Sequence, residues 1–234
     1  MNLALVFPGQ GSQNSSMLDV FKDNASFRNT LEKASDILNY NIADIVQDES
    51  KLNNTIYTQP LVLAVSYAIY KILKEESNPD IKIAAGHSLG EYSALVCNNT
   101  INFRDGLLLV KKRAELMSKA MDNIDGAMAA VIGLEGNIVD EICKVSTKDN
   151  EVIEAVNFNC PGQTVIAGHS VAIDNITPIL KNRGAKIIKK LPVSIAAHTS
   201  LLKPVADNLM DELDKIIFNS NTFDIVHNYD LSIS

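Results

Sequence analysis

The motif Gly-His-Ser-Leu-Gly at 86–90 joins two segments of different periodicity, and this junction constrains the fold most strongly. The apolar run at 81–85 before it has the length of a buried strand, and the segment at 91–97 after it has apolar residues at helical spacing. Glycine permits the tight turn that such a junction needs. A continuous apolar strand followed at once by a helix is typical of a parallel sheet covered by helices.

Strands and helices alternate from the N-terminus to about residue 120, which predicts a doubly wound α/β layer. The run Leu3 to Phe7 predicts a buried first strand inside the sheet, and a glycine-rich turn at 8–12 stops it. Helices are expected at 27–38 and 59–73.

The region between 126 and 192 has a different order of elements: strand, helix, strand, strand, helix, strand. They are expected at 127–132, 137–145, 152–158, 164–167, 171–182 and 186–191. This is the order of the ferredoxin-like unit, an antiparallel sheet with helices on one face. We therefore expect a main domain at 1–125 and 193–234 with a ferredoxin-like subdomain inserted at 126–192. A helix at 201–216 and a strand at 223–226 are expected after the subdomain.

Composition and charge limit the class of protein. The chain has 234 residues, of which 46% are hydrophobic and 21% charged, as in folded globular proteins. Its net charge of −7 opposes binding to nucleic acid. The longest apolar stretch, 60–73, is shorter than the ~20 residues that span a bilayer. The N-terminus lacks a basic leader, and three widely spaced cysteines indicate neither disulfides nor a metal site. We expect a cytoplasmic protein that contacts no nucleic acid and no membrane.

The turn at 86–90 fits the pattern G-x-S-x-G, in which a serine stands clear of the sheet as a nucleophile. The N–H of the next residue, Leu89, then faces the oxygen that becomes negatively charged during acyl transfer. A purely structural glycine and serine turn is the alternative. The strand before it and the helix after it favour the catalytic interpretation of Ser88.

A nucleophilic serine needs a base, and the chain offers four histidines: His87, His169, His198 and His227. His87 lies in the turn itself, where neighbouring side chains diverge, and His169 follows a strand of the expected subdomain. His198 lies in the loop that returns to the main domain, and such loops line active sites. We favour His198, although the residues alone leave the choice open.

Five segments in sequence order carry a family resemblance. They are Phe-Pro-Gly-Gln-Gly-Ser-Gln at 7–13, Thr-Gln-Pro at 58–60, Gly-His-Ser-Leu-Gly-Glu-Tyr-Ser-Ala at 86–94, Asn-Phe-Asn-Cys-Pro-Gly-Gln at 157–163, and Pro-Val-Ser at 192–194 leading to His198. Together they resemble the malonyl-CoA:acyl carrier protein transacylase family over essentially the whole chain. The resemblance implies an α/β-hydrolase-like parallel-sheet domain with an inserted ferredoxin-like subdomain.

The resemblance also implies the catalytic residues. Ser88 matches the nucleophile and His198 the base of a ping-pong acyl transfer from malonyl-CoA to a phosphopantetheine thiol, for fatty acid biosynthesis. The backbone amides of Gln10 and Leu89 would form the oxyanion hole. No permanently bound cofactor and no metal is implied.

Substrate binding is implied for further residues. Arg113 matches an arginine that grips the free carboxylate of malonyl, and Gln59 lies in the same pocket. Without the resemblance, Arg113 would be taken for a solvated helix charge. Asn157 and Asn159 match a loop near the cleft that can contact pantetheine, but holding the turn at 161–162 by local hydrogen bonds is the simpler role.

The implied partners are coenzyme A and acyl carrier protein, which is acidic, so a basic docking face is expected. A monomer is expected if the chain is complete. Five cations lie within ten residues and supply a candidate face. They are Lys181, Arg183, Lys186, Lys189 and Lys190. A solvated surface without a partner is the alternative.

The proteins that this sequence resembles continue for several tens of residues beyond the match at 226–230, so we expect the C-terminal part of the main domain to be lacking. Two alternatives to an active transacylase follow: a catalytically weak form that binds coenzyme A or carrier protein, and a serine hydrolase or thioesterase. Arg113 and the turn at Gln10 count against the hydrolase. Small Ala196 and Ala197 beside His198 leave room for methylmalonyl as well as malonyl.

Overall fold

The structure is a computed structural model that describes residues 2–193 and 195–234. The chain forms two compact units. The first comprises Met1–Glu115 and Asp211–Ser234, and the second comprises Leu116–Met210. The domain bounds expected from the sequence, 1–125 with 193–234 and 126–192, stay a prediction.

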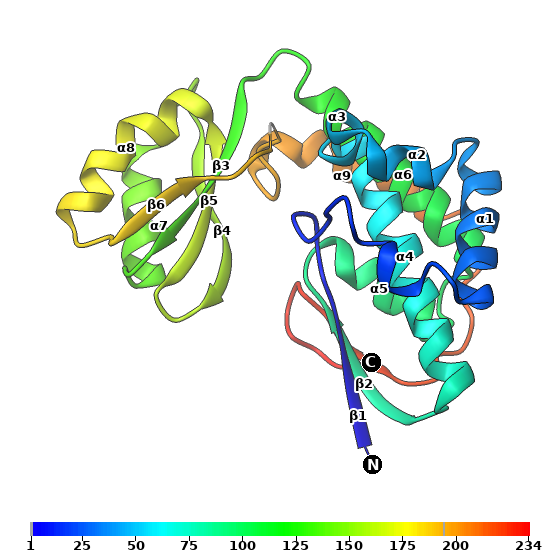
Figure 1. Ribbon diagram of the computed structural model, residues 1–234. Helices are drawn as coiled ribbons and strands as arrows, with labels where there is room; N and C mark the ends of the chain where they lie inside the picture. Colours follow the sequence, from blue (N-terminus) through cyan, green and yellow to red (C-terminus); the bar gives the residue numbers. More distant parts are fainter. Residues whose placement is uncertain (1, 194) are drawn as a thin grey trace. The chain divides into compact units, whose positions relative to one another are not determined.

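The first unit contains a parallel sheet of β1 (Asn2–Phe7), β2 (Asp80–Gly86) and β7 (Asp224–Val226), in the order β1-β2-β7. Figure 1 shows β1 and β2 side by side, and β7 pairs with the other edge of β2. Apolar side chains of the sheet pack against α5 (Leu89–Cys97), with Phe7, Ala84 and Ala94 in one buried cluster. The predicted α/β class with a parallel sheet is confirmed.

The sequence prediction for β1 is wrong in one respect. The strand lies at the edge of the described sheet rather than inside it, and Val6 is 81% exposed. An apolar run cannot distinguish a strand buried on both faces from one that buries a single face, because the distinction depends on which elements cover it.

Helices on this unit begin at side chains that cap them. Asn24 caps α1 (Ala25–Leu38), Asn41 caps α2 (Ile42–Gln47), Asp48 caps α3 (Glu49–Leu52) and Asn54 caps α4 (Thr55–Glu76). Each side-chain oxygen accepts a backbone N–H of the first turn, which would otherwise lack a partner. A 3₁₀ turn, Asp19–Phe21, precedes α1.

The long helix α4 is the apolar centre of the unit. It is the one described helix long and apolar enough to cross a membrane, yet 61% of its most apolar window is buried inside the protein. Leu61, Leu63 and Ala64 are fully buried. The helix is therefore built like the core helix of a globular unit.

The second unit contains β3 (Gly126–Ile132), α7 (Gly136–Ser146), β4 (Ile153–Cys160), β5 (Gln163–His169), α8 (Ser170–Asn182) and β6 (Ile187–Lys190). The strands are antiparallel in the order β4-β5-β3-β6. Figure 1 shows α7 and α8 beside this sheet, and Ile142, Ile166 and Ile173 belong to the core between them. The predicted ferredoxin-like arrangement is confirmed.

Two helices extend across the boundary between the units. The first is α6 (Phe103–Ala120), and the second is α9 (Lys203–Leu213). The sequence predicted one helix at 201–216, whereas the chain forms a 3₁₀ turn, Ser200–Leu202, before α9. Pro204 lies in the first turn of α9, where its missing N–H costs no hydrogen bond, and this favours a helix start at Lys203.

Candidate active site

The turn between β2 and α5 holds Ser88 in an unusual backbone conformation. Its φ is 51° and its ψ is −106°, outside the regions that non-glycine residues favour. The N–H of His87 donates to the carbonyl of Phe7 at 3.0 Å, and the N–H of Gly90 donates to the carbonyl of His87 at 2.9 Å. The surrounding chain thus holds the strained residue in place, as expected for a functional turn.

Glycine is required on both sides of Ser88 by space. A Cβ on Gly86 would lie 1.9 Å from the carbonyl carbon of Gly90, and a Cβ on Gly90 would lie 2.2 Å from the carbonyl oxygen of Phe7. These contacts are with backbone atoms, which cannot rotate away. The motif therefore lets the start of α5 pack directly against β2 and the end of β1.

Arg113 on α6 reaches Ser88. Its Nη2 donates to Ser88 Oγ at 3.4 Å, and its Nη1 makes a short hydrogen bond to Oε1 of Gln59. The guanidinium lies over the ring of Tyr92, 5.5 Å from the centroid, which adds a cation–π contact. Burial lowers the pKa of Arg113, but arginine keeps its charge in proteins. A half-buried positive charge therefore lies beside the serine.

A chain of side-chain hydrogen bonds joins this arginine to the glycine-rich turn after β1. Gln59 Nε2 donates to Thr55 Oγ1 at 2.9 Å, and Thr55 Oγ1 donates to Gln10 Oε1 at 2.9 Å. Gln59 and Thr55 are buried on α4. The four predicted residues Ser88, Arg113, Gln59 and Gln10 are thus connected within one unit.

Two backbone amides are candidates for the oxyanion hole. Leu89 is the first residue of α5, so its N–H has no acceptor within the helix and points out of the helix N-terminus. Gln10 lies between Gly9 and Gly11, whose φ is 103°. The roles of these amides stay predictions.

The remaining predicted residues belong to the second unit. His198 is exposed and has a φ of 66°. Its loop is fixed by Thr199 Oγ1, which donates to the carbonyl of Ala196 at 2.8 Å, and by Ser200, which donates through N and Oγ to the carboxylate of Glu154. Ser194, part of one motif, lies outside the described residues.

Asn157 and Asn159 lie near the end of β4. Asn157 is half-buried and faces Val165 of β5, and Asn159 is exposed. Neither placement tests their predicted contact with pantetheine, so both the binding role and the structural role remain open.

The other histidines differ in their surroundings. Nδ1 of His169 accepts the N–H of Val152 at 3.0 Å, which gives that ring a structural role. His227 lies 2.9 Å from Oε1 of Glu91 through Nδ1, and 2.7 Å from Oγ of Ser234 through Nε2. His87 is exposed in the turn.

The cysteines are poor alternatives to Ser88. Burial raises the pKa of the Cys97 thiol well above its usual value and raises that of Cys143 to about 12. Both thiols therefore stay protonated at neutral pH and are weak nucleophiles. Cys160 is exposed, and all three are free thiols. Among the described residues, no group of His, Cys, Asp and Glu side chains is arranged to hold a metal ion.

The cations proposed for carrier-protein docking are exposed. Lys181 and Arg183 lie at the end of α8, and Lys189 lies on β6. Lys190 is paired with Asp174 at 2.8 Å, which offsets part of its charge.

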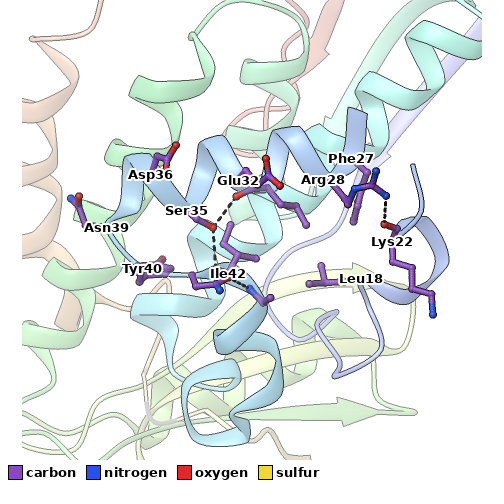
Figure 2. Close-up of a pocket in the computed structure, with 13 residues that line it drawn as sticks. Leu18, Lys22, Phe27, Arg28, Glu32, Ser35, Asp36, Asn39, Tyr40 and Ile42 are labelled. Atoms are coloured by element: carbon purple, nitrogen blue, oxygen red, sulfur yellow. Dashed lines mark hydrogen bonds between the residues drawn. The ribbon is translucent and has the colours of Figure 1, made fainter. Parts of the chain in front are cut away.

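A cavity of about 820 Å³ lies in the first unit between α1 and α2. Figure 2 shows that Ser35 connects the two helices there: its Oγ donates to the carbonyl of Leu31 at 2.9 Å and accepts the N–H of Ile42 at 3.1 Å. None of the residues predicted to be catalytic lines this cavity.

Four residues of the site were missed by the sequence prediction: Thr55, Glu91, Tyr92 and Asn228. Thr55 precedes Gln59 by one helical turn, and Glu91 and Tyr92 follow the motif at 86–90 directly, so local spacing could have identified them. Asn228 contacts the turn from 140 residues away, and no local signal predicts such a contact.

Comparison with known proteins identifies one family. The acyl transferase domain family matches residues 4–231. The malonyl CoA-acyl carrier protein transacylase of Haemophilus influenzae is 43% identical over 233 residues, covering 97% of this chain and 74% of that protein. The enzyme of the same name from Escherichia coli K12 is 42% identical over 231 residues, with the same two coverages.

Solved structures give the same result. The malonyl CoA-acyl carrier protein transacylase of Coxiella burnetii has a TM-score of 0.94 at 36% identity, over 99% of this chain and 74% of that one. A malonyl-transacylase in complex with a type II PKS acyl-carrier protein has a TM-score of 0.95 at 40% identity, over 100% of this chain and 76% of that one.

Proposed function

Because this chain belongs to the acyl transferase domain family, and within it to the malonyl CoA-acyl carrier protein transacylases, we propose that Ser88 carries the malonyl group between two thiols. The family resemblance found in the sequence motifs is confirmed. The chain is an acyltransferase that moves malonyl from malonyl-CoA to acyl carrier protein for fatty acid biosynthesis. Malonyl-CoA is the donor substrate, and nucleophilic catalysis of this kind uses no resident cofactor.

The contact between Ser88 and Arg113 carries the assignment of the site. A half-buried guanidinium beside a nucleophile suits an acyl group that ends in a carboxylate, because the two planar groups pair through parallel hydrogen bonds. Gln59 and Tyr92 are neutral partners, so they orient the guanidinium and leave its charge for the substrate. Hydrolysis of simple esters would gain nothing from this arrangement.

The reaction proceeds in two matched steps. Ser88 Oγ attacks the thioester carbonyl of malonyl-CoA, the carbon–sulfur bond breaks, and coenzyme A leaves as a thiol with the proton that Ser88 gave up. In the second step the thiol of the carrier protein attacks the Ser88 ester and releases the serine. His198 accepts and returns the proton in each step, and the amides of Leu89 and Gln10 stabilise the oxyanion.

The finer features of partner binding are also proposals. The exposed cations of α8 and β6 suit an acidic carrier protein, with Lys190 contributing least because Asp174 already pairs with it. The contact of Asn157 and Asn159 with pantetheine is likewise a proposal, and stabilisation of the turn at 161–162 is the alternative role. We assign the enzyme to the cytoplasm, in keeping with three free cysteines. A monomer is proposed for the complete protein.

Substitution of Arg113 tests the proposed site. We expect Arg113→Ala to lower kcat/KM for malonyl transfer by about 10- to 100-fold, since a hydrogen bond to a charged group contributes about 1.5–3 kcal/mol. Transfer of acetyl, which lacks the carboxylate, should change by less than about threefold. The measurement is the rate of transfer from each acyl-CoA to carrier protein.

Lys112→Ala provides the matched control, because Lys112 is the preceding cation on α6. It should leave the malonyl-to-acetyl ratio unchanged. An Arg113→Ala enzyme that keeps the wild-type ratio would contradict the carboxylate clamp.

A further inference from the structure

We propose that Asn228 is a positioning residue that holds the Ser88 turn in its strained conformation. The side chain of Asn228 bridges the two ends of the turn: its Nδ2 donates to the carbonyl of Gly86 at 2.7 Å, and its Oδ1 accepts the N–H of Ser88 at 3.3 Å. The proposal rests on Ser88 as the nucleophile of the proposed function.

The end of the parallel ladder explains why an asparagine is suited to this position. The pairing of β2 with β7 ends at Ala85 opposite Val226, two residues before Asn228. The next polar backbone groups along that edge of β2 are the carbonyl of Gly86 and the N–H of Ser88. A carboxamide carries one acceptor and a donor group in a plane, as a peptide group does, so the side chain continues the ladder where the backbone cannot.

Glu91 fixes Asn228 in turn. The N–H of Asn228 donates to Glu91 Oε2 at 3.1 Å, and Nδ2 makes a short hydrogen bond to the same oxygen. The second oxygen of the carboxylate, Oε1, lies 2.9 Å from Nδ1 of His227. Since Glu91 lies in the first turn of α5, directly after the motif, this carboxylate connects the helix that follows Ser88 to the segment after β7.

The segment that carries Asn228 is itself held at both ends. Ile225 and Ser234 exchange backbone hydrogen bonds of 2.8 and 3.2 Å, and the N–H of His227 donates to the carbonyl of Ser232 at 2.9 Å. Asn228 therefore lies in a loop whose two ends are joined by backbone hydrogen bonds. The positive φ of Ser88 is a conformation that costs a non-glycine residue about 1–3 kcal/mol. Such a conformation persists only where the surrounding structure holds it.

The consequence for catalysis follows from geometry. Releasing the N–H of Ser88 would let the peptide between His87 and Ser88 rotate, which would move Ser88 Oγ and, through the backbone of Ser88, the Leu89 amide. A misplacement of about 1 Å at a reacting group costs about 10²-fold in rate. Binding of malonyl through Arg113 would not depend on this rotation.

The test compares variants of the whole chain by two readouts. Asn228→Ala should slow formation of the malonyl-enzyme about 10- to 100-fold, while the apparent KM for malonyl-CoA stays within about twofold. Labelling of Ser88 by a fluorophosphonate, which needs a reactive serine but no malonyl, should slow by a similar factor. Asn219→Ala is the control, because Asn219 lies in the same C-terminal segment and binds the carbonyl of Asn99, away from the turn.

A conservative pair keeps the proposal testable if Asn228→Ala fails to fold. Asn228→Asp retains the acceptor for the N–H of Ser88, but it places a second carboxylate beside that of Glu91. Because the two negative charges repel each other, labelling of Ser88 should be slow. Adding Glu91→Gln removes that repulsion and supplies an N–H donor to the new carboxylate at position 228. Labelling of Ser88 in this double variant should be at least about fivefold faster than in Asn228→Asp. A folded Asn228→Ala enzyme with wild-type labelling, or a double variant no faster than Asn228→Asp, would overturn the proposal.

The two readouts also separate this proposal from the proposed function. If the wild-type chain is labelled by the fluorophosphonate but not by malonyl-CoA, the transacylase assignment fails, and the labelling rates still decide the role of Asn228. If wild-type Ser88 is not labelled at all, the serine is not a reactive group, and the positioning proposal is rejected.

Discussion

Ser88 shows how a few residues can determine a strained turn. Its conformation depends on the missing side chains of Gly86 and Gly90, because the backbone atoms of neighbouring segments occupy the space where each Cβ would be. The spacing of the two glycines around the serine is local information, so the turn could be predicted from the sequence, and the role of Ser88 as nucleophile stays a prediction.

We expect Gly90→Ala to destabilise the fold by about 1–3 kcal/mol, the usual cost of overpacking. The added Cβ would lie 2.2 Å from the carbonyl oxygen of Phe7, so either α5 or the end of β1 must move. The measurement is the free energy of unfolding in urea, together with labelling of Ser88.

Ser93→Ala is the matched control for this prediction, on the same helix. Within the described residues, the buried Oγ of Ser93 has no hydrogen-bond partner, so its removal should leave stability unchanged or raise it by up to about 0.5 kcal/mol. Equal stability of the two variants would show that the close approach at Gly90 is not required.

Other residues of the site depend on tertiary structure. Arg113 is one of three consecutive basic residues on α6, and only folding determines that its guanidinium lies over Tyr92. Its role was therefore predicted through the family motifs and not through its local sequence. Asn228 lies even further from any local signal, since its partners are Gly86, Ser88 and Glu91.

At the scale of elements, apolar periodicity predicted where most helices and strands lie. It predicted the residues at which they begin and end less accurately. The helix expected at 59–73 extends from Thr55 to Glu76, because Asn54 caps it and polar residues continue it at the C-terminal end. In place of the helix expected at 201–216, the chain forms a 3₁₀ turn and then α9. Pro204 favours a helix start at Lys203, because its missing N–H costs no hydrogen bond in the first turn. Short helices such as α2 and α3 were not predicted, because six or fewer residues show no clear period.

An element-level prediction concerns the loop that carries His198. Glu154 on β4 accepts two hydrogen bonds from Ser200, one of them from the backbone N–H at 3.0 Å. We expect Glu154→Ala to raise the hydrogen-exchange rate of the Ser200 amide about five- to tenfold, because an exposed bond to a carboxylate contributes about 1 kcal/mol. The measurement is hydrogen exchange resolved to the peptide containing 198–202.

Glu151→Ala is the control, since Glu151 precedes the same strand and pairs with Lys148. Exchange at 198–202 should be unchanged in that variant. If both variants behave alike, the loop is held by Thr199 and not by Glu154.

At the scale of the molecule, the chain combines a parallel sheet and a ferredoxin-like sheet. The order of elements along the sequence was sufficient to predict both, because each sheet type has its own succession of strands and helices. The exposure of β1 could not be predicted in this way, since it depends on which elements cover the strand.

A surface prediction belongs to this scale as well. Reversing the charge of Lys181, Arg183, Lys186 and Lys189 should raise the apparent KM for carrier protein about tenfold, because these exposed cations would meet an acidic partner. Malonyl exchange with coenzyme A should be unaffected. Charge reversal at Lys74, on α4 of the other unit, is the control, and an equal effect on both acceptors would contradict docking at this surface.

The central claim, that Ser88 carries malonyl between coenzyme A and carrier protein, is tested most directly by intact-mass spectrometry. The chain of residues 1–234 is exposed briefly to malonyl-CoA beside Ser88→Ala, and carrier protein is then added. We predict a malonyl adduct on the wild-type chain only, which disappears as the carrier protein gains the same mass. A folded chain that forms no adduct, or an adduct lost to water without reaching the carrier protein, would contradict the account.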